Sequence, residues 1–190
     1  MKPPVTHTTR KGKTYYLHTG PKRGGGVQYF FAMKSSGALA KQLPDGFEIF
    51  ESVHGQVFLR RKQPSLIHDE ETACIQSQLA KPRGKTLYRI EVRGDTVTIF
   101  DSTDQFGGEL ERYLGNSPHN LADLRERFAV YQPAVRFILV DGEKRLFAPE
   151  RFCYRGSVDD WISIGRPEPV KKLVAKYLVH LGRDSLFELY

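Results

Sequence analysis

The chain has 190 residues, which is long enough to bury a substantial core as one large domain or as two small ones. Its 39% hydrophobic and 27% charged residues exclude wholesale disorder, and its formal net charge at pH 7 is +7. No apolar run approaches the roughly 20 residues of a membrane helix, and Met1–His7 lacks the apolar core of a signal peptide, so we expect a cytoplasmic protein with no membrane partner.

The positive charge is concentrated in the first third of the chain. Residues 1–63 carry eleven Lys and Arg against three acids, a net charge of +8, whereas residues 64–190 carry eighteen against nineteen, a net charge of −1. This asymmetry favours a polyanionic partner for the N-terminal part, with nucleic acid the commonest candidate. The alternative is a solvated basic surface with no such partner.

The N-terminal third predicts an arm followed by two β-hairpins. Residues 1–13 are basic, contain two prolines and have little apolar content, so we expect a flexible arm. Residues 14–63 predict a basic two-hairpin β subdomain. Its hairpins pair Tyr15–Thr19 with Val27–Lys34 and Phe47–Glu51 with Gln56–Lys62.

The loop of the first hairpin, residues 21–26, is basic and contains three glycines, so its backbone can approach a ligand phosphate or simply turn. In the strand that follows, the alternation of side chains predicts one face for the core. That face carries Val27, Tyr29, Phe31 and Met33. Residues 35–43 then predict a short helix, which Pro44 and Gly46 end with a turn.

A shared open face results if both hairpins turn their apolar sides to the same core. It would carry Phe30, Lys34, Phe58, Arg60 and Lys62. Aromatic rings among cations are typical of single-stranded nucleic-acid binders, because the rings stack on bases while Lys and Arg meet phosphates. The alternative is that a later helix covers the two phenylalanine rings.

We therefore predict a nucleic-acid-binding surface formed by the N-terminal sheet and arm. Its predicted cations are Lys11, Lys13, Lys22, Arg23, Lys34, Arg60, Arg61 and Lys62, and its predicted stacking rings are Phe30 and Phe58. The ligand is DNA or RNA, which the sequence does not distinguish.

The rest of the chain predicts a linking helix and a larger subdomain. Residues 64–84 contain a helix at about Asp69–Lys81 with acids in its first turn, and residues 85–190 form an α+β subdomain. Its expected elements are a hairpin through Gly94 and Asp95, a helix from Asn120 to about Tyr131, strands at Ala134–Asp141, Lys144–Ala148, Arg151–Tyr154 and Asp160–Ile164, and a helix from Pro169 to Leu181. The whole chain predicts an α+β fold of mostly antiparallel strands, in hairpins and a meander, with three or four helices.

The sequence carries no recognisable catalytic motif. The six histidines form no HExxH pair, Cys74 and Cys153 form no CxxC motif, and no GxSxG is present, so we predict no zinc site and no cofactor. Carboxylates at strand ends and in loops leave a Mg²⁺-dependent nuclease as one alternative, although such acids are usually turn formers. These are Asp101, Asp104, Asp141, Glu143, Asp159 and Asp160.

Several phrases of the chain are similar to a group of uncharacterised bacterial proteins. They are Lys13–His18, Val27–Phe31, Pro44–Glu51 with Gln56–Arg61, Arg151–Gly156 and His180–Leu189. The resemblance spans both ends of the chain and implies a bacterial cytoplasmic origin, but no activity, cofactor or catalytic residue. Our leading hypothesis is a non-enzymatic nucleic-acid-binding module, and the alternatives are a protein-interaction or structural component and the nuclease.

Overall fold

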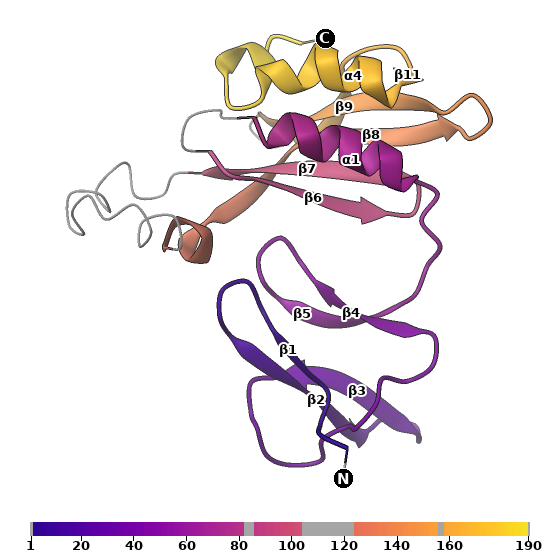
Figure 1. Cartoon of the computed structure of the whole chain (residues 1–190), viewed down its shortest axis with the longest axis vertical. Helices are drawn as coiled ribbons and strands as arrows, with labels where there is room; N and C mark the ends of the chain where they lie inside the picture. The colour runs from indigo at the N-terminus through magenta and orange to yellow at the C-terminus, as the bar shows by residue number, and fades with distance from the viewer. Residues whose placement is uncertain (1, 82–85, 104–123, 156–157, 190) are drawn as a thin grey trace. The chain divides into compact units, whose positions relative to one another are not determined.

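The computed structural model describes residues 2–81, 86–103, 124–155 and 158–189. The chain divides into two compact units with a boundary between Gln63 and Pro64, and residues 124–128 belong to unit 1. Unit 1 consists mainly of antiparallel strands, and unit 2 combines an antiparallel sheet with helices (Figure 1). The predicted α+β class, with its hairpins and meander, is confirmed.

Unit 1 contains both predicted hairpins. Its strands are β1 (Thr6–Thr8), β2 (Thr14–Pro21), β3 (Val27–Ala32), β4 (Phe47–Glu51) and β5 (Val57–Arg61). The first three form one sheet in the order β1-β2-β3, and β4 pairs with β5 in a separate two-stranded sheet (Figure 1). The two hairpins are therefore not one continuous sheet.

The segment that precedes β2 is packed rather than free. Strand β1 pairs antiparallel with β2, and the buried Thr9 donates its backbone N–H to the Lys13 carbonyl at 2.8 Å. Arg10 donates from its backbone N and from Nη1 to Glu51 Oε1, both at 3.2 Å. The prediction of a flexible arm is wrong for residues 6–13, because hydrogen bonds that the local composition does not reveal hold this segment.

The helix predicted at residues 35–43 does not form. The Ala40 N–H donates to the Leu17 carbonyl and the Thr19 N–H to the Ala38 carbonyl, both at 2.8 Å. These residues therefore lie against β2 as an extended segment, and Gly37 has a φ of 117°, which no helix contains. Satisfying backbone groups of β2 outweighs the weak helix propensity of a Ser-Ser-Gly start.

The predicted core face of β3 is largely exposed. Val27 and Met33 are each 60% exposed and Tyr29 is exposed too, whereas Leu17 on the neighbouring strand is fully buried. Strand β3 is an edge strand of its sheet. Alternation determines which side chains share a face of a strand, but not whether another layer covers that face.

Unit 2 is built on a meander. Its strands are β6 (Tyr88–Arg93), β7 (Thr96–Thr103), β8 (Val130–Asp141), β9 (Leu146–Arg155), β10 (Val158–Ser163) and β11 (Glu168–Pro169). They form one antiparallel sheet in the order β10-β9-β8-β7-β6, with β11 paired to β9. The single strand β9 replaces the two short strands predicted between residues 144 and 154.

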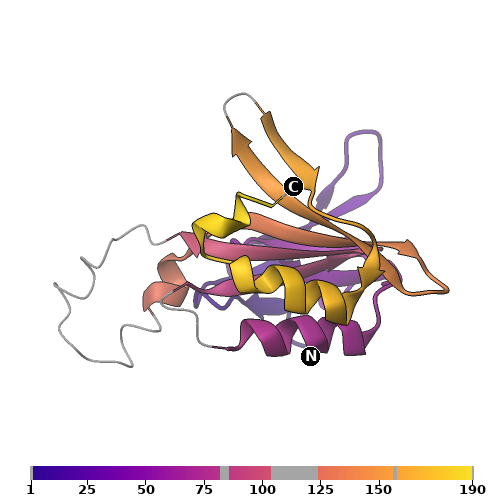
Figure 2. The same ribbon diagram turned by 90° about the horizontal axis from the view of Figure 1, so that it is seen from above.

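The helices of unit 2 are α1 (Asp69–Leu79) and α4 (Val170–Tyr177), which continues into a short 3-10 helix at Leu178–His180. Both lie on the same face of the sheet (Figure 2). A further helical segment, at residues 124–128 of unit 1, ends before β8 begins at Val130, so the helix predicted to reach Tyr131 is too long. Residues 120–123 of that prediction lie outside the described residues.

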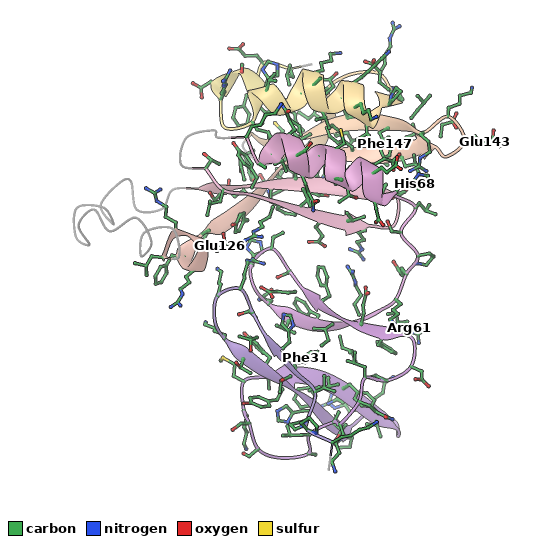
Figure 3. All side chains as sticks on the ribbon, in the orientation of Figure 1. Phe31, Arg61, His68, Glu126, Glu143 and Phe147 are labelled. Atoms are coloured by element: carbon green, nitrogen blue, oxygen red, sulfur yellow. The ribbon has the colours of Figure 1, made fainter. Side chains whose placement is uncertain are left out.

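The core of unit 2 lies between the sheet and the two helices. Phe137, Phe147 and Leu173 are fully buried there, and Figure 3 labels Phe147. Cys153 is buried and Cys74 packs against the same core; both are free thiols. The principal buried cluster of the described residues belongs to this unit, which leaves unit 1 with a small core and much exposed strand surface.

Candidate functional site

The ten predicted binding residues fall into three groups within unit 1. Lys11 and Lys13 lie in the turn between β1 and β2. The second group belongs to the β2–β3 hairpin and its continuation, and comprises Lys22, Arg23, Phe30 and Lys34. The third lies on or directly after β5, where Figure 3 labels Arg61, and comprises Phe58, Arg60, Arg61 and Lys62.

The second and third groups do not share one open face, which corrects the prediction. Alternation places His7 on the side of its sheet opposite Phe30, and Glu51 on the side of its hairpin opposite Phe58. His7 Nε2 lies 2.8 Å from Glu51 Oε2, so these two sides face each other. Phe30 and Phe58 therefore point outward from two different sheets. They are 44% and 47% exposed, and neither is sealed beneath a helix.

Arg60 in the third group already has partners. Its Nη2 lies 2.8 Å from Glu48 Oε1, and its guanidinium carbon lies 4.0 Å from the centre of the Phe50 ring. A carboxylate directly across the hairpin thus compensates its charge. Arg61 and Lys62 are exposed, with Arg61 lying 5.7 Å over the Phe47 ring.

Lys11 of the first group lies in the electrostatic field of neighbouring cations and of two carboxylates, Glu51 and Glu126. Burial lowers the pKa of Lys11, and the positive charges of Arg10 and Lys13 lower it further. Arg10 in turn lies 3.2 Å from a carboxylate oxygen of Glu51 and 3.4 Å from one of Glu126. The charge of Arg10 is therefore balanced within unit 1, whereas Lys13 is exposed.

The loop of the second group is exposed and has a backbone conformation that depends on glycine. Its turn is closed by the Lys22 N–H, which donates to the Gly26 carbonyl at 3.1 Å. Gly24, Gly25 and Gly26 have φ values of 93°, 94° and 91°, a conformation that favours glycine, and every residue of the loop is exposed. Three residues without side chains let a ligand approach the backbone closely beside Lys22 and Arg23.

Phe30 is held on a second ring. The rings of Phe30 and His18 are nearly parallel, with centroids 5.4 Å apart and an angle of 14° between their planes. His18 is only 7% exposed, and its Nε2–H donates to the Lys34 carbonyl at 2.9 Å. We call Lys22, Arg23, Phe30 and Lys34 the hairpin surface. Its three cations are exposed and have no ion-pair partner among the residues that the structure describes.

His18 is not among the residues predicted for the site. The signal was present, because pairing the two strands of the first hairpin places His18 directly opposite Phe30. A lone histidine on a strand is usually an ordinary packed residue, and only the ring geometry assigns it a role as the support of Phe30.

In a second group of rings, in unit 2, each ring contacts a neighbouring ring, and Tyr154 is 46% exposed. The Phe152 ring lies 4.7 Å from that of Tyr154 and 5.1 Å from that of Trp161. Arg136 lies 4.3 Å over the Trp161 ring and forms an ion pair with Glu150. The cation of this cluster already has a carboxylate and a ring as partners, so the cluster offers a weaker case for an anionic ligand than the hairpin surface does.

The carboxylates considered for a nuclease lie at two ends of the unit 2 sheet. Asp101 and Asp159 are at one end, three strand spacings or about 14 Å apart by the register. Asp141 and Glu143 are at the β8–β9 turn, where Figure 3 shows Glu143 at the tip. Among the residues described, no group of three or more His, Cys, Asp or Glu is placed to hold a metal ion. Asp104 lies outside the described residues.

Comparison of the chain with protein-family models, with curated proteins and with solved structures finds no match. In the described ranges, none of the helices combines the length and apolarity needed to cross a bilayer. The charge, exposure and ring contacts of the hairpin surface are the observations that bear most directly on function.

Proposed function

We propose that the protein is a nucleic-acid-binding module and that the hairpin surface is its contact surface. One observation carries the proposal: three exposed cations without an ion-pair partner among the described residues flank a half-exposed aromatic ring. Cations of this kind neutralise phosphates and release their counterions, and an exposed ring offers a surface to a base.

The other predicted cations play smaller parts in this proposal. Lys13, Arg61 and Lys62 are exposed and add to a positive field that attracts a polyanion at a distance. Arg60 contributes less, because Glu48 compensates its charge. The net charge of +8 over residues 1–63 supports association with an anionic partner rather than defining where it binds.

The proposal is tested by reversing the charge of the hairpin surface. We expect the variant Lys22→Glu, Arg23→Glu, Lys34→Glu to bind a labelled DNA or RNA oligonucleotide at least about tenfold more weakly at 0.1 M salt. The slope of log K against log salt concentration should fall in magnitude by about 2 to 3, because each lost phosphate contact removes roughly 0.7 to 0.9. Fluorescence anisotropy over a salt series measures both quantities.

The control reverses two charges, Lys171→Glu with Lys172→Glu, on the exposed side of α4 in unit 2. It changes net charge in the same direction but leaves the hairpin surface intact, so affinity should fall far less. Wild-type protein that binds no oligonucleotide would reject the proposal. Equal losses in the two variants would reduce it to a general effect of net charge.

A second function is favoured by apolar side chains that stay exposed on the other side of β3, the side that faces the β4–β5 hairpin. Val27, Tyr29 and Met33 are exposed there, and a row of exposed apolar side chains on an edge strand is typical of a protein-interaction surface. If this side mediates self-association, the wild-type chain should be an oligomer in analytical ultracentrifugation, and Val27→Lys with Met33→Lys should dissociate it into monomers. A monomeric wild-type chain would count against self-association through this side.

A further inference from the structure

Phe30 presents an open ring on a fixed base. One side of the ring rests on His18, with the centroids 5.4 Å apart, yet 44% of the residue stays exposed. Directly beside it on β2 lies Gly20, whose missing side chain leaves an edge of the ring uncovered; a Cβ there would stand 3.5 Å from Phe30 Cε1. The ring is therefore supported from below and accessible from above.

The support beneath the ring is itself immobilised. His18 donates a hydrogen bond to the Lys34 carbonyl, and its ring lies near Gly37, where a Cβ would stand 3.9 Å from Cε1. The backbone of His18 also pairs with Leu39 on the edge of β2 opposite β3. A ring fixed in this way loses little conformational entropy when a second flat group stacks on it, which favours binding.

The same hydrogen bond places a cation beside the ring. It ties the backbone of Lys34 to His18, so the exposed Lys34 side chain starts next to the Phe30–His18 stack. Lys22 and Arg23 stand at the other end of β3, beyond the glycines of the loop. A cation thus lies on each side of the ring along the strand, an order that matches a chain with phosphates on both sides of a base.

We propose that the hairpin surface binds single-stranded rather than duplex nucleic acid, and that one unpaired base stacks on the open face of Phe30. This inference rests on the proposed function. In a duplex the faces of the bases are already stacked on one another, so an exposed protein ring gains a partner only from an unpaired base. Positive charge alone does not discriminate between the two forms, whereas the ring does.

The test compares Phe30→Ala with Phe58→Ala in the full chain. Phe58 is a matched control because it lies in the same unit, is 47% exposed and has no stacked ring beneath it among the described residues. We expect Phe30→Ala to weaken binding of a dT or U oligonucleotide about 5-fold to about 150-fold, with little change for a hairpin-free duplex of equal length. Phe58→Ala should change neither affinity by more than about threefold.

A spectroscopic variant separates stacking from loss of packing. Phe30→Trp keeps a flat ring on His18, so single-strand affinity should be retained. The emission that this substitution adds to that of Trp161 should be quenched by the single strand and not by the duplex. An affinity that falls for Phe30→Ala but is kept in Phe30→Trp cannot come from partial unfolding of the hairpin.

The possible failures are distinguishable. If charge reversal at Lys22, Arg23 and Lys34 abolishes binding but Phe30→Ala leaves single-strand affinity unchanged, or if the wild-type protein prefers the duplex, the stacking inference is overturned and the proposed function survives. If the wild-type protein binds neither oligonucleotide, both are overturned. Losses of equal size for Phe30→Ala on single strand and duplex also overturn the stacking inference.

Discussion

Gly165→Ala is expected to lower the free energy of unfolding by about 3 kcal/mol. A Cβ at position 165 would stand 2.0 Å from the Tyr177 hydroxyl oxygen. Tyr177 is almost completely buried, and its hydroxyl donates to the Ile164 carbonyl at 2.8 Å. The Tyr177 hydroxyl cannot move away from the added Cβ without breaking its hydrogen bond to Ile164 and disturbing the packing of α4.

Chemical denaturation followed through Trp161 measures this prediction, because the only tryptophan lies in unit 2. Gly142→Ala is the control, since no heavy atom lies within 4 Å of a Cβ there and the change should have little effect. Removing the clashing oxygen with Tyr177→Phe leaves the ring carbon Cζ at 3.2 Å, a milder contact. The double variant should therefore lose about 1 to 2 kcal/mol less than the sum of the single losses, and simple additivity would contradict the proposed clash.

Glu71→Ala is expected to lower the free energy of unfolding by about 2 to 3 kcal/mol. Glu71 is nearly buried at the start of α1, and its carboxylate accepts hydrogen bonds from Arg145 and, at 2.9 Å, from the backbone N–H of His68. Arg145 Nε lies 2.9 Å from the other carboxylate oxygen, and the same guanidinium donates to the Leu66 carbonyl. One carboxylate thus caps the helix and joins it to the β8–β9 turn.

The stabilisation from Glu71 should depend on pH. Burial acts to raise the pKa of its carboxyl group, but the hydrogen bonds from Arg145 and His68 and the charge of Arg145 outweigh burial and hold the pKa below the ordinary value of 4.5. A lowered pKa in the folded state stabilises the protein above pH 4.5, and this contribution is lost as the pH falls through the folded-state value.

Unfolding free energies of the wild type and Glu71→Gln, measured between pH 3 and pH 7, check this expectation. The difference between them should be constant near neutrality and shrink on acidification. Glu143→Gln, at the exposed tip of the β8–β9 turn, is the control and should change stability by less than about 0.5 kcal/mol. A wild-type advantage that is the same at pH 3 and pH 7 would show that the ionised carboxylate is not the stabilising species.

The positions of most elements could be predicted because they depend on local signals. Alternating apolar residues and glycine turns predicted both hairpins of unit 1. The acids of the first turn predicted the start of α1 at Asp69, and the predicted end at Lys81 lies two residues beyond the observed end at Leu79. The exceptions were segments held by distant partners. Residues 6–8 form a strand because they pair with β2. Residues 38–40 form backbone hydrogen bonds with β2 instead of a helix.

The candidate site divides in the same way. Sequence alone determined that the cations gather in residues 1–63 and that Phe30 lies on the side of its strand opposite Tyr29 and Phe31, because charge is a property of composition and alternation follows from backbone geometry. Only the tertiary structure decided that Phe58 belongs to a different sheet, that Glu48 neutralises Arg60 and that His18 lies under Phe30. These contacts depend on which strands pair and which faces of the sheets meet. Both are determined by packing and backbone hydrogen bonds between residues far apart in the chain, which no short stretch of sequence encodes.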